Sequence, residues 1–99
     1  MKQFLDFTDR VCLVTGAGSE NGIGFQTARI LGTLGGTVII VSTTDRILKR
    51  AEELRAEGAD VKGLIADLMD RQAVQHLVKD IMDEYGRIDV LVNNAGMVQ

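Results

Sequence analysis

The chain alternates short apolar runs with longer segments in which apolar and polar residues mix. Four runs are almost continuously apolar, at residues 11–14, 38–41, 63–66 and 88–92. Strands that are buried on both faces of a parallel sheet have this pattern, because neither face meets solvent. The pattern therefore predicts four strands of a parallel sheet.

The segments between these runs have the period of an amphipathic helix, at residues 24–34, 45–57 and 70–85. The third stripe is the clearest and consists of Ala73, Val74, Leu77, Val78, Ile81, Met82 and Tyr85. Glycines stand where each helix should end, at Gly35-Gly36, Gly58 and Gly86, and glycine takes the left-handed conformation of a helix end at little cost. Asp70 or Thr44 is expected to cap the helix that follows it.

The order of these elements predicts an α/β fold. The arrangement β-α-β-α-β-α-β with short connections implies right-handed crossovers and a Rossmann-like parallel sheet with helices on both faces. At 99 residues the chain has room for one domain and no more.

Composition narrows the class of protein. Apolar residues make up 45% and charged residues 25%, which is ordinary for a globular domain. The net charge of −3, without a basic cluster, argues against nucleic acid as a partner. No run approaches the roughly 18 apolar residues of a membrane helix, and the amino terminus lacks a signal-peptide pattern. We therefore expect a cytoplasmic protein with no membrane partner, in which the single Cys12 is buried and inert.

The stretch VTGAGSENGIG, residues 14–24, joins the first strand to the first helix. The unpaired N–H groups and the dipole at a helix N-terminus attract a pyrophosphate, and glycines let the backbone approach it. Gly16 would end the strand, Gly22 would permit close approach, and Gly24 would let the helix pack tightly on the sheet. Ser19 could add a hydroxyl group. A glycine-rich turn that holds no ligand is the alternative.

Three motifs in order resemble the short-chain dehydrogenase/reductase family. They are Thr15-Gly16 with Gly22-Ile23-Gly24, then Asp67-Leu68 after the third strand, then Asn93-Asn94-Ala95-Gly96 after the fourth. The resemblance spans residues 9–98 and implies an NAD(P)-dependent oxidoreductase that moves a hydride between the nicotinamide and a small carbonyl or alcohol substrate. It also implies the strand order 3-2-1-4, with this chain forming the amino-terminal part of a single dinucleotide-binding domain.

The resemblance assigns roles to individual residues. Asp67 should bond the adenine beside Leu68, and Asn94 and its neighbours should line the adenosine ribose, although Asp67 as a turn cap and the two asparagines as a plain loop are alternatives. The cofactor-binding residues expected in all are Gly16, Gly18, Ser19, Gly22, Ile23, Gly24, Ser42, Thr43, Thr44, Arg46, Asp67, Leu68, Asn94, Ala95 and Gly96. The loop departs from the family spacing, because five residues separate Gly16 from Gly22 where the family commonly has three.

The end of the second strand favours NADP over NAD. Hydroxyl side chains at 42–44 stand where NAD enzymes of this fold carry an acid for the ribose 2′-hydroxyl, and Arg46 would reach a 2′-phosphate. Asp45 is the dissenting residue: it either touches the ribose of NAD or lies in the first turn of the second helix.

The catalytic part of the family pattern is missing from these 99 residues. The family uses Tyr-x-x-x-Lys, but the single tyrosine, Tyr85, is followed four residues later by Asp89 and completes the third apolar stripe. His76 has no second histidine nearby and is expected to be a surface or half-buried residue rather than a metal ligand. We therefore expect no catalytic residues and no metal site.

The remaining expectations concern association and the kind of protein. The resemblance implies that the fourth strand is central in the family's full sheet, whereas here residues 89–92 would form an apolar edge with unpaired backbone groups, so the chain should associate as a homo-oligomer or aggregate. Among family members, the chain resembles the 3-oxoacyl thioester reductases of fatty-acid synthesis. A non-catalytic dinucleotide-binding or interaction module is the second hypothesis, and another nucleotide-binding α/β protein such as a methyltransferase ranks last.

Overall fold

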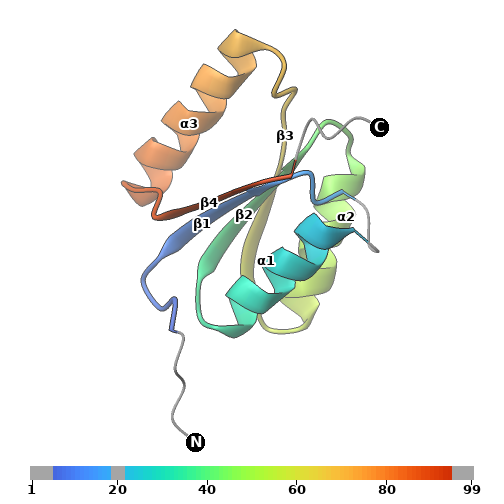
Figure 1. Cartoon of the computed structure of the whole chain (residues 1–99), viewed down its shortest axis with the longest axis vertical. Helices are drawn as coiled ribbons and strands as arrows, with labels where there is room; N and C mark the ends of the chain where they lie inside the picture. The colour runs from blue at the N-terminus through green and yellow to red at the C-terminus, as the bar shows by residue number, and fades with distance from the viewer. Residues whose placement is uncertain (1–5, 19–21, 95–99) are drawn as a thin grey trace, which may run out of the picture.

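The computed structural model describes residues 6–18 and 22–94, in which four strands alternate with three helices (Figure 1). The elements are β1 Val11–Thr15, α1 Ile23–Thr33, β2 Thr37–Ser42, α2 Arg46–Ala56, β3 Asp60–Ile65, α3 Arg71–Tyr85 and β4 Val90–Asn93. Every expected element is present. The largest differences are at β3, which begins three residues before the apolar run at Gly63, and at β4, which begins at Val90 instead of Ile88.

The four strands form one parallel sheet in the order β3-β2-β1-β4. β1 lies in the middle, where Leu13 pairs with Ile39 on one side and with Leu91 on the other. This confirms the expected order. β3 and β4 are the two edges of the sheet within the described residues.

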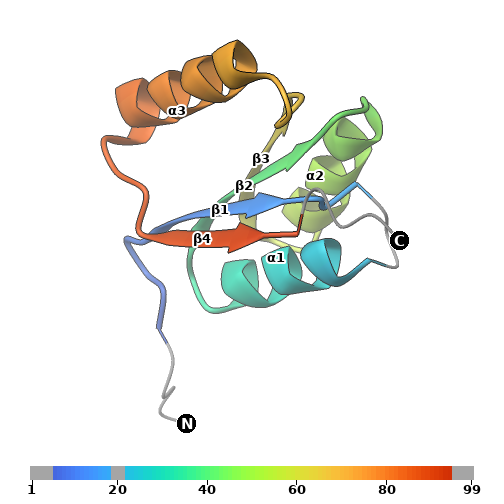
Figure 2. The same ribbon diagram turned by 45° about the horizontal axis from the view of Figure 1, so that its top comes forward.

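Helices cover both faces of the sheet, as Figure 2 shows, with α1 and α2 on one face and, among the described residues, α3 alone on the other. Neighbouring residues of a strand point to opposite faces. In β1, Cys12 and Val14 therefore join the α1/α2 side of the core, whereas Val11 and Leu13 join the α3 side. The expectation of a buried Cys12 thiol is confirmed, and its burial raises the thiol pKa.

The helix ends agree with the glycine pattern, with one correction at a cap. Gly35, Gly58 and Gly86 all have positive φ angles, the last of them at 78° as the residue that ends α3. Asp70 caps α3 through a hydrogen bond from the Gln72 N–H. Thr44 as a cap of α2 is wrong, because α2 begins after Asp45 and no side chain caps it.

All four strands run the same way, so their carboxyl ends meet at one edge of the sheet. The turn after β1, the start of the segment after β2, the turn after β3 and Asn94 after β4 lie together there. Across the described residues, no helix is long and apolar enough to cross a membrane.

Candidate functional site

A cavity of about 640 Å³ opens at the carboxyl edge of the sheet, beside α3. Polar residues at the ends of the strands and apolar residues of the sheet and of α3 line it. The lining residues are Leu13, Thr15, Gly16, Val41, Ser42, Thr43, Ala66, Asp67, Leu68, Met69, Val74, Leu77, Val78, Leu91, Asn93 and Asn94. Ligands of open α/β sheets bind at this end of the strands.

The turn after β1 is tied to β2 by its first two amides. The Gly16 N–H donates to the Val41 carbonyl at 2.9 Å, and the Ala17 N–H reaches the same oxygen at 3.5 Å. Gly16 has a φ of 69°, which turns the chain back toward β2 at the end of the strand. These two amides are therefore used within the protein and are not available to an anion.

The start of α1 has donors for an anion. Gly22 precedes the helix in an extended conformation, and no side chain caps the first turn within the described residues. The first N–H groups of a helix have no partner inside it, and the helix dipole adds partial positive charge there. Ile23, at the first helical position, is exposed beside them. Ser19 lies outside the described residues.

Two glycines leave room that a side chain would fill. A Cβ added at Gly24 would lie 2.7 Å from the Gly16 carbonyl oxygen and 3.1 Å from Asn94 Nδ2. The helix therefore approaches the end of β1 closely, which is the packing role expected of Gly24. A Cβ added at Gly18 would lie 2.7 Å from Ser42 Oγ, so the loop also packs against the end of β2.

Thr15 joins the ends of β1 and β4, a contact that the sequence pattern does not indicate. Its buried hydroxyl donates to Asn93 Oδ1 at 2.9 Å and accepts from the Asn94 N–H at 3.0 Å. The side-chain amide of Asn94 is then held toward the start of α1, and its Nδ2 is buried with no hydrogen-bond partner in the described structure. A buried donor without a partner costs free energy, so this atom suits a ligand acceptor. Ala95 and Gly96 lie outside the described residues.

The residues from the end of β2 onward form a second group of possible donors. The Ser42 and Thr43 side chains line the cavity, whereas Thr44 and Arg46 do not. Ser42 Oγ accepts from the Thr44 N–H at 3.4 Å, and Thr44 Oγ1 accepts from Arg46 Nε at 3.3 Å. Asp45 is the residue directly before α2, one position short of the first helical turn in which the plainer of its two interpretations placed it.

Asp67 and Leu68 follow β3 at the cavity. Asp67 is exposed, and its Oδ1 accepts from the Met69 N–H at 2.9 Å, which closes a local turn. One oxygen of the Asp67 carboxylate therefore caps the local turn, as the alternative interpretation expected. The Asp67 carboxylate still lines the cavity. Leu68 is half-buried and packs against the apolar residues on the α3 side of the sheet.

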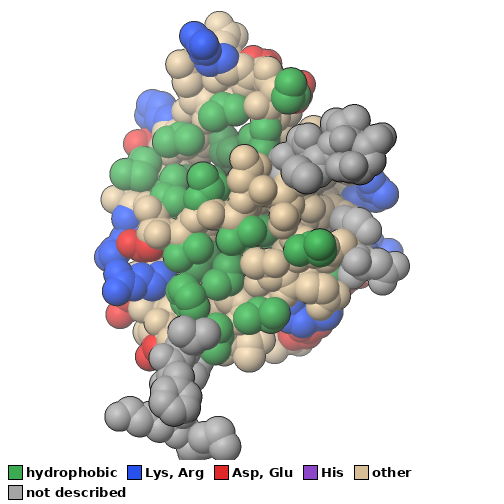
Figure 3. Space-filling model, in the orientation of Figure 1, with side chains coloured by type: hydrophobic (Ala, Val, Ile, Leu, Met, Phe, Trp, Pro, Cys, Tyr) green, Lys and Arg blue, Asp and Glu red, His purple; other side chains and the backbone are tan. Residues whose placement is uncertain are grey.

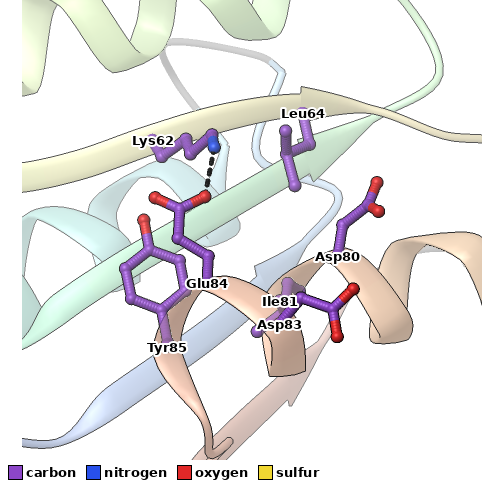
Figure 4. A pocket seen from close by; sticks show the side chains of 7 residues that line it. All are labelled: Lys62, Leu64, Asp80, Ile81, Asp83, Glu84 and Tyr85. Carbon is purple, nitrogen blue, oxygen red and sulfur yellow. Dashed lines mark hydrogen bonds and ion pairs between the residues drawn. The ribbon is translucent and has the colours of Figure 1, made fainter.

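A smaller cavity of about 340 Å³ lies between β3 and the second half of α3 (Figure 4). Lys62 pairs with Glu84 across it at 2.5 Å, and Tyr85 stands beside them. Burial, and then a hydrogen bond with Glu84, raises the pKa of Tyr85 to about 12. Tyr85 is half-buried against the α3 side of the core, as expected.

The described part of the chain contains no candidate metal site. No three His, Cys, Asp or Glu side chains there lie close enough together to hold a metal ion. His76 is exposed on α3, which is one of the two positions expected for it.

The parallel sheet, the glycine-rich sequence between β1 and α1 and the cavity at the strand ends together define a Rossmann-like α/β protein. Residues 10–99 match the family model described as short chain dehydrogenase. The chain belongs to the short-chain dehydrogenase family.

Two curated relatives and one solved structure illustrate the match. Subunit BbsD of the (2S)-[(R)-hydroxy(phenyl)methyl]succinyl-CoA dehydrogenase of Thauera aromatica is 41% identical over 90 residues, which cover 90% of this chain and 36% of that protein. The 3-oxoacyl-[acyl-carrier-protein] reductase FabG of Thermotoga maritima is 38% identical over 94 residues, covering 91% and 36%.

The solved structure is a metagenomic short-chain oxidoreductase in complex with NADP. It matches with a TM-score of 0.85 at 34% identity, over 92% of this chain and 41% of that chain. The present chain therefore spans little more than a third of the length of the two curated relatives.

Proposed function

We propose that this chain is the cofactor-binding part of an NAD(P)-dependent oxidoreductase of the short-chain type. One observation carries the proposal: the uncapped start of α1 and the partnerless Asn94 Nδ2 lie together where the strands end. Both are donors, so the site suits a ligand rich in acceptor oxygens.

The described residues would hold a dinucleotide in three places. The amides at the start of α1 would bind the pyrophosphate. Gly24 would help to place them, because it lets the helix pack closely against the end of β1. Asp67 would bond the adenine next to Leu68, using the carboxylate oxygen that the local turn does not use. Asn94, fixed through Thr15, would bond the ribose nearby. The bound nicotinamide supplies hydride transfer to or from a carbonyl carbon.

The cofactor proposed is NADP, with NAD as the alternative. Ser42 and Thr43 would donate to a 2′-phosphate at the cavity, and the Arg46 guanidinium, which is linked to Thr44, would supply positive charge nearby. No acid stands at the end of β2, because Asp45 belongs to the start of α2. The similar metagenomic oxidoreductase was solved with NADP, which supports this choice.

The chemistry itself would need residues beyond these 99. Since the sequence holds no Tyr-x-x-x-Lys, we propose that this chain supplies the cofactor half-site for a small carbonyl or alcohol substrate. Similarity to the Thermotoga FabG favours 3-oxoacyl thioesters among such substrates. The absence of Tyr-x-x-x-Lys from these 99 residues also favours the second candidate function, a non-catalytic dinucleotide-binding module.

Calorimetric titration of the 99-residue chain with NADPH, NADH and ATP tests the binding site. We expect NADPH to bind more tightly than NADH, and both to bind more tightly than ATP, which lacks the second nucleotide. Tighter NADH would overturn the choice of NADP. Equal and negligible binding of all three would overturn the proposed function.

A further inference from the structure

Arg50, on α2, is the only charged residue that is buried in the described part of the chain, where it is 8% exposed. The other charged residues there are half-buried or exposed. In Figure 3 the lysine and arginine side chains lie around the outline of the molecule, while hydrophobic side chains occupy much of its centre. Taking a guanidinium out of water costs free energy unless other groups compensate for the lost hydration. The contacts that offset this cost indicate what Arg50 does.

Arg50 bonds within its own helix and also reaches across to α1. Its Nη2 donates to Glu53 Oε2 at 2.9 Å, about one turn further along α2. Its guanidinium carbon lies 5.7 Å from the centre of the Phe25 ring. Phe25 belongs to α1 and is 2% exposed. A cation this close to an aromatic ring is attracted to it, and the attraction is stronger where water is excluded. Arg50 therefore joins α2 to α1.

The Arg50–Phe25 contact lies near the start of both helices. Each helix begins at the carboxyl edge of the sheet, because each follows the end of a parallel strand. Phe25 is the third residue of α1 and Arg50 is the fifth of α2, so both lie within about one and a half turns of the helix start. The start of α1 is the proposed pyrophosphate site, and residues 42–46 are the proposed 2′-phosphate site. The contact therefore lies close to both proposed phosphate sites.

Further contacts between these two segments lie toward the carboxyl ends of the helices. Arg29 donates to both carboxylate oxygens of Glu57, which follows α2, at 3.0 and 2.9 Å. A Cβ added at Gly32 would lie 2.8 Å from the Ala59 Cβ. The packing of α2 on the sheet is apolar and therefore non-directional. Near the cofactor site, it is the contact with Phe25 that fixes the place of α2 beside α1.

We propose that Arg50 is a positioning residue for NADP, which acts through the residues at the start of α2. The inference rests on the proposed function, because it concerns the same cofactor site. Arg46 is the first residue of α2 and moves with the helix. The pyrophosphate and the 2′-phosphate belong to one molecule, so both groups of donors bind it together only at the right separation. Fixing that separation in advance lowers the cost of binding. NAD lacks the 2′-phosphate and does not depend on it.

Calorimetric titration of Arg50→Met with NADPH and NADH tests this role. Methionine keeps an unbranched apolar side chain and removes the cation, while the Glu53 side chain, which is 33% exposed, remains hydrated. The dissociation constant for NADPH should rise about fivefold, the size expected from the loss of one cation–π contact. The dissociation constant for NADH should change less than about twofold. The preference for NADPH should therefore fall.

Arg29→Met is the matched control. Arg29 lies over the same Phe25 ring at 5.0 Å, but it comes from α1 itself and does not join the ring to α2. Its substitution should leave the preference for NADPH unchanged. Phe25→Leu removes the ring and keeps an apolar side chain, so it should lower the preference as Arg50→Met does. The double variant should lower it no further, because both substitutions remove one contact. Circular dichroism establishes that each variant folds.

The outcomes separate this role from a merely structural one. Equal weakening of both nucleotides by Arg50→Met would show that the residue serves the fold alone and would overturn the inference. An equal fall in preference for Arg29→Met, or additive effects in the double variant, would do the same. If Arg50→Met does not fold, Phe25→Leu decides by the same criterion.

The wild type distinguishes failure of the inference from failure of the proposed function. A wild-type chain that prefers NADPH, with that preference unchanged in Arg50→Met, overturns the inference and leaves the proposed function intact. A wild type that binds both nucleotides equally overturns the choice of NADP together with the inference. A wild type that binds neither nucleotide overturns the proposed function, and the inference with it.

Discussion

The two faces of the sheet are closed to very different degrees. On the face covered by α1 and α2, which we name the closed layer, Phe25, Ile40, Ile47 and Leu54 are all fully buried. On the face covered by α3 alone, the open layer, the helix buries only Leu77 and Ile81, and a cavity of about 640 Å³ opens beside them. One helix is too narrow to cover four strands, so in the described part of the chain the open layer keeps the cavity that we propose as the cofactor site.

The largest effect on stability should come from truncating a buried leucine to alanine in each layer. We expect Leu54→Ala, in the closed layer, to lower the free energy of unfolding toward the upper part of about 2–5 kcal/mol, because rigid neighbours leave an empty cavity. Leu77→Ala, in the open layer, should fall toward the lower end of that range, because Leu77 already borders a cavity that water can enter. Urea denaturation of both variants measures the difference. Equal losses would contradict the distinction between the layers.

The next largest effect should come from a negative charge added at Ser42, which lines the cavity of the open layer. Ser42→Asp should weaken NADPH binding at least tenfold, about 1.4 kcal/mol, while NADH binding changes less, because the new carboxylate repels the 2′-phosphate. Ser42→Asn is the matched control, with the same size and no charge, and it separates repulsion from crowding against Gly18. Calorimetric titration with both nucleotides gives the ratio. If Ser42→Asn weakens NADPH as much as Ser42→Asp does, the phosphate does not lie there.

The fold follows from local patterns that the sequence displays directly. The continuous apolar runs predicted the parallel strands, and the glycines at 35, 58 and 86 marked the helix ends, because both depend on neighbours in the sequence. The start of β3 was missed since Lys62 interrupts the apolar run. Lys62 is tolerated in this strand because β3 lies at an edge of the sheet, where the Lys62 side chain reaches Glu84.

The candidate site was only partly predictable, because its contacts join residues far apart in the chain. The family motifs placed Gly24, Asp67 and Asn94 at the strand ends, but not the bonds among them. The Gly16 N–H bonds the Val41 carbonyl, and the Thr15 hydroxyl bonds the Asn94 N–H. Both bonds depend on which strands flank β1 and in what register. Neither partner is visible in the local sequence.

A pH titration examines how β4 is attached to the rest of the sheet. The hydrogen bond from Arg87, followed by the bond from the Val11 N–H, lowers the pKa of Asp89 below its usual value. A carboxyl group with a lowered folded-state pKa stabilises the fold above its unfolded pKa of about 3.9, and this contribution is lost as pH falls through the folded value. Wild-type stability should therefore fall more steeply than that of Asp89→Asn as pH drops below about 4.

Thermal unfolding from pH 7 to pH 2 provides the measurement for this prediction. At pH 7, Asp89→Asn should melt at a lower temperature than the wild type, and the two melting curves should approach each other in acid. Asp80→Asn is the control, since Asp80 is exposed on α3 with no ion pair found within the described residues. A constant difference between wild type and Asp89→Asn across the whole range would show that the charge of Asp89 is not what attaches β4.

The smallest effect should be the same in both layers, which makes it a test of where their difference originates. Gly58 follows α2 in the closed layer and Gly86 follows α3 in the open layer, with φ angles of 97° and 78° and open space where a Cβ would stand. Alanine at either position brings only the local cost of a left-handed conformation, about 1 kcal/mol. Urea denaturation should therefore give equal losses for Gly58→Ala and Gly86→Ala. A clearly larger loss in one layer would show that the helix ends, and not only the packing between helix and sheet, distinguish the two faces.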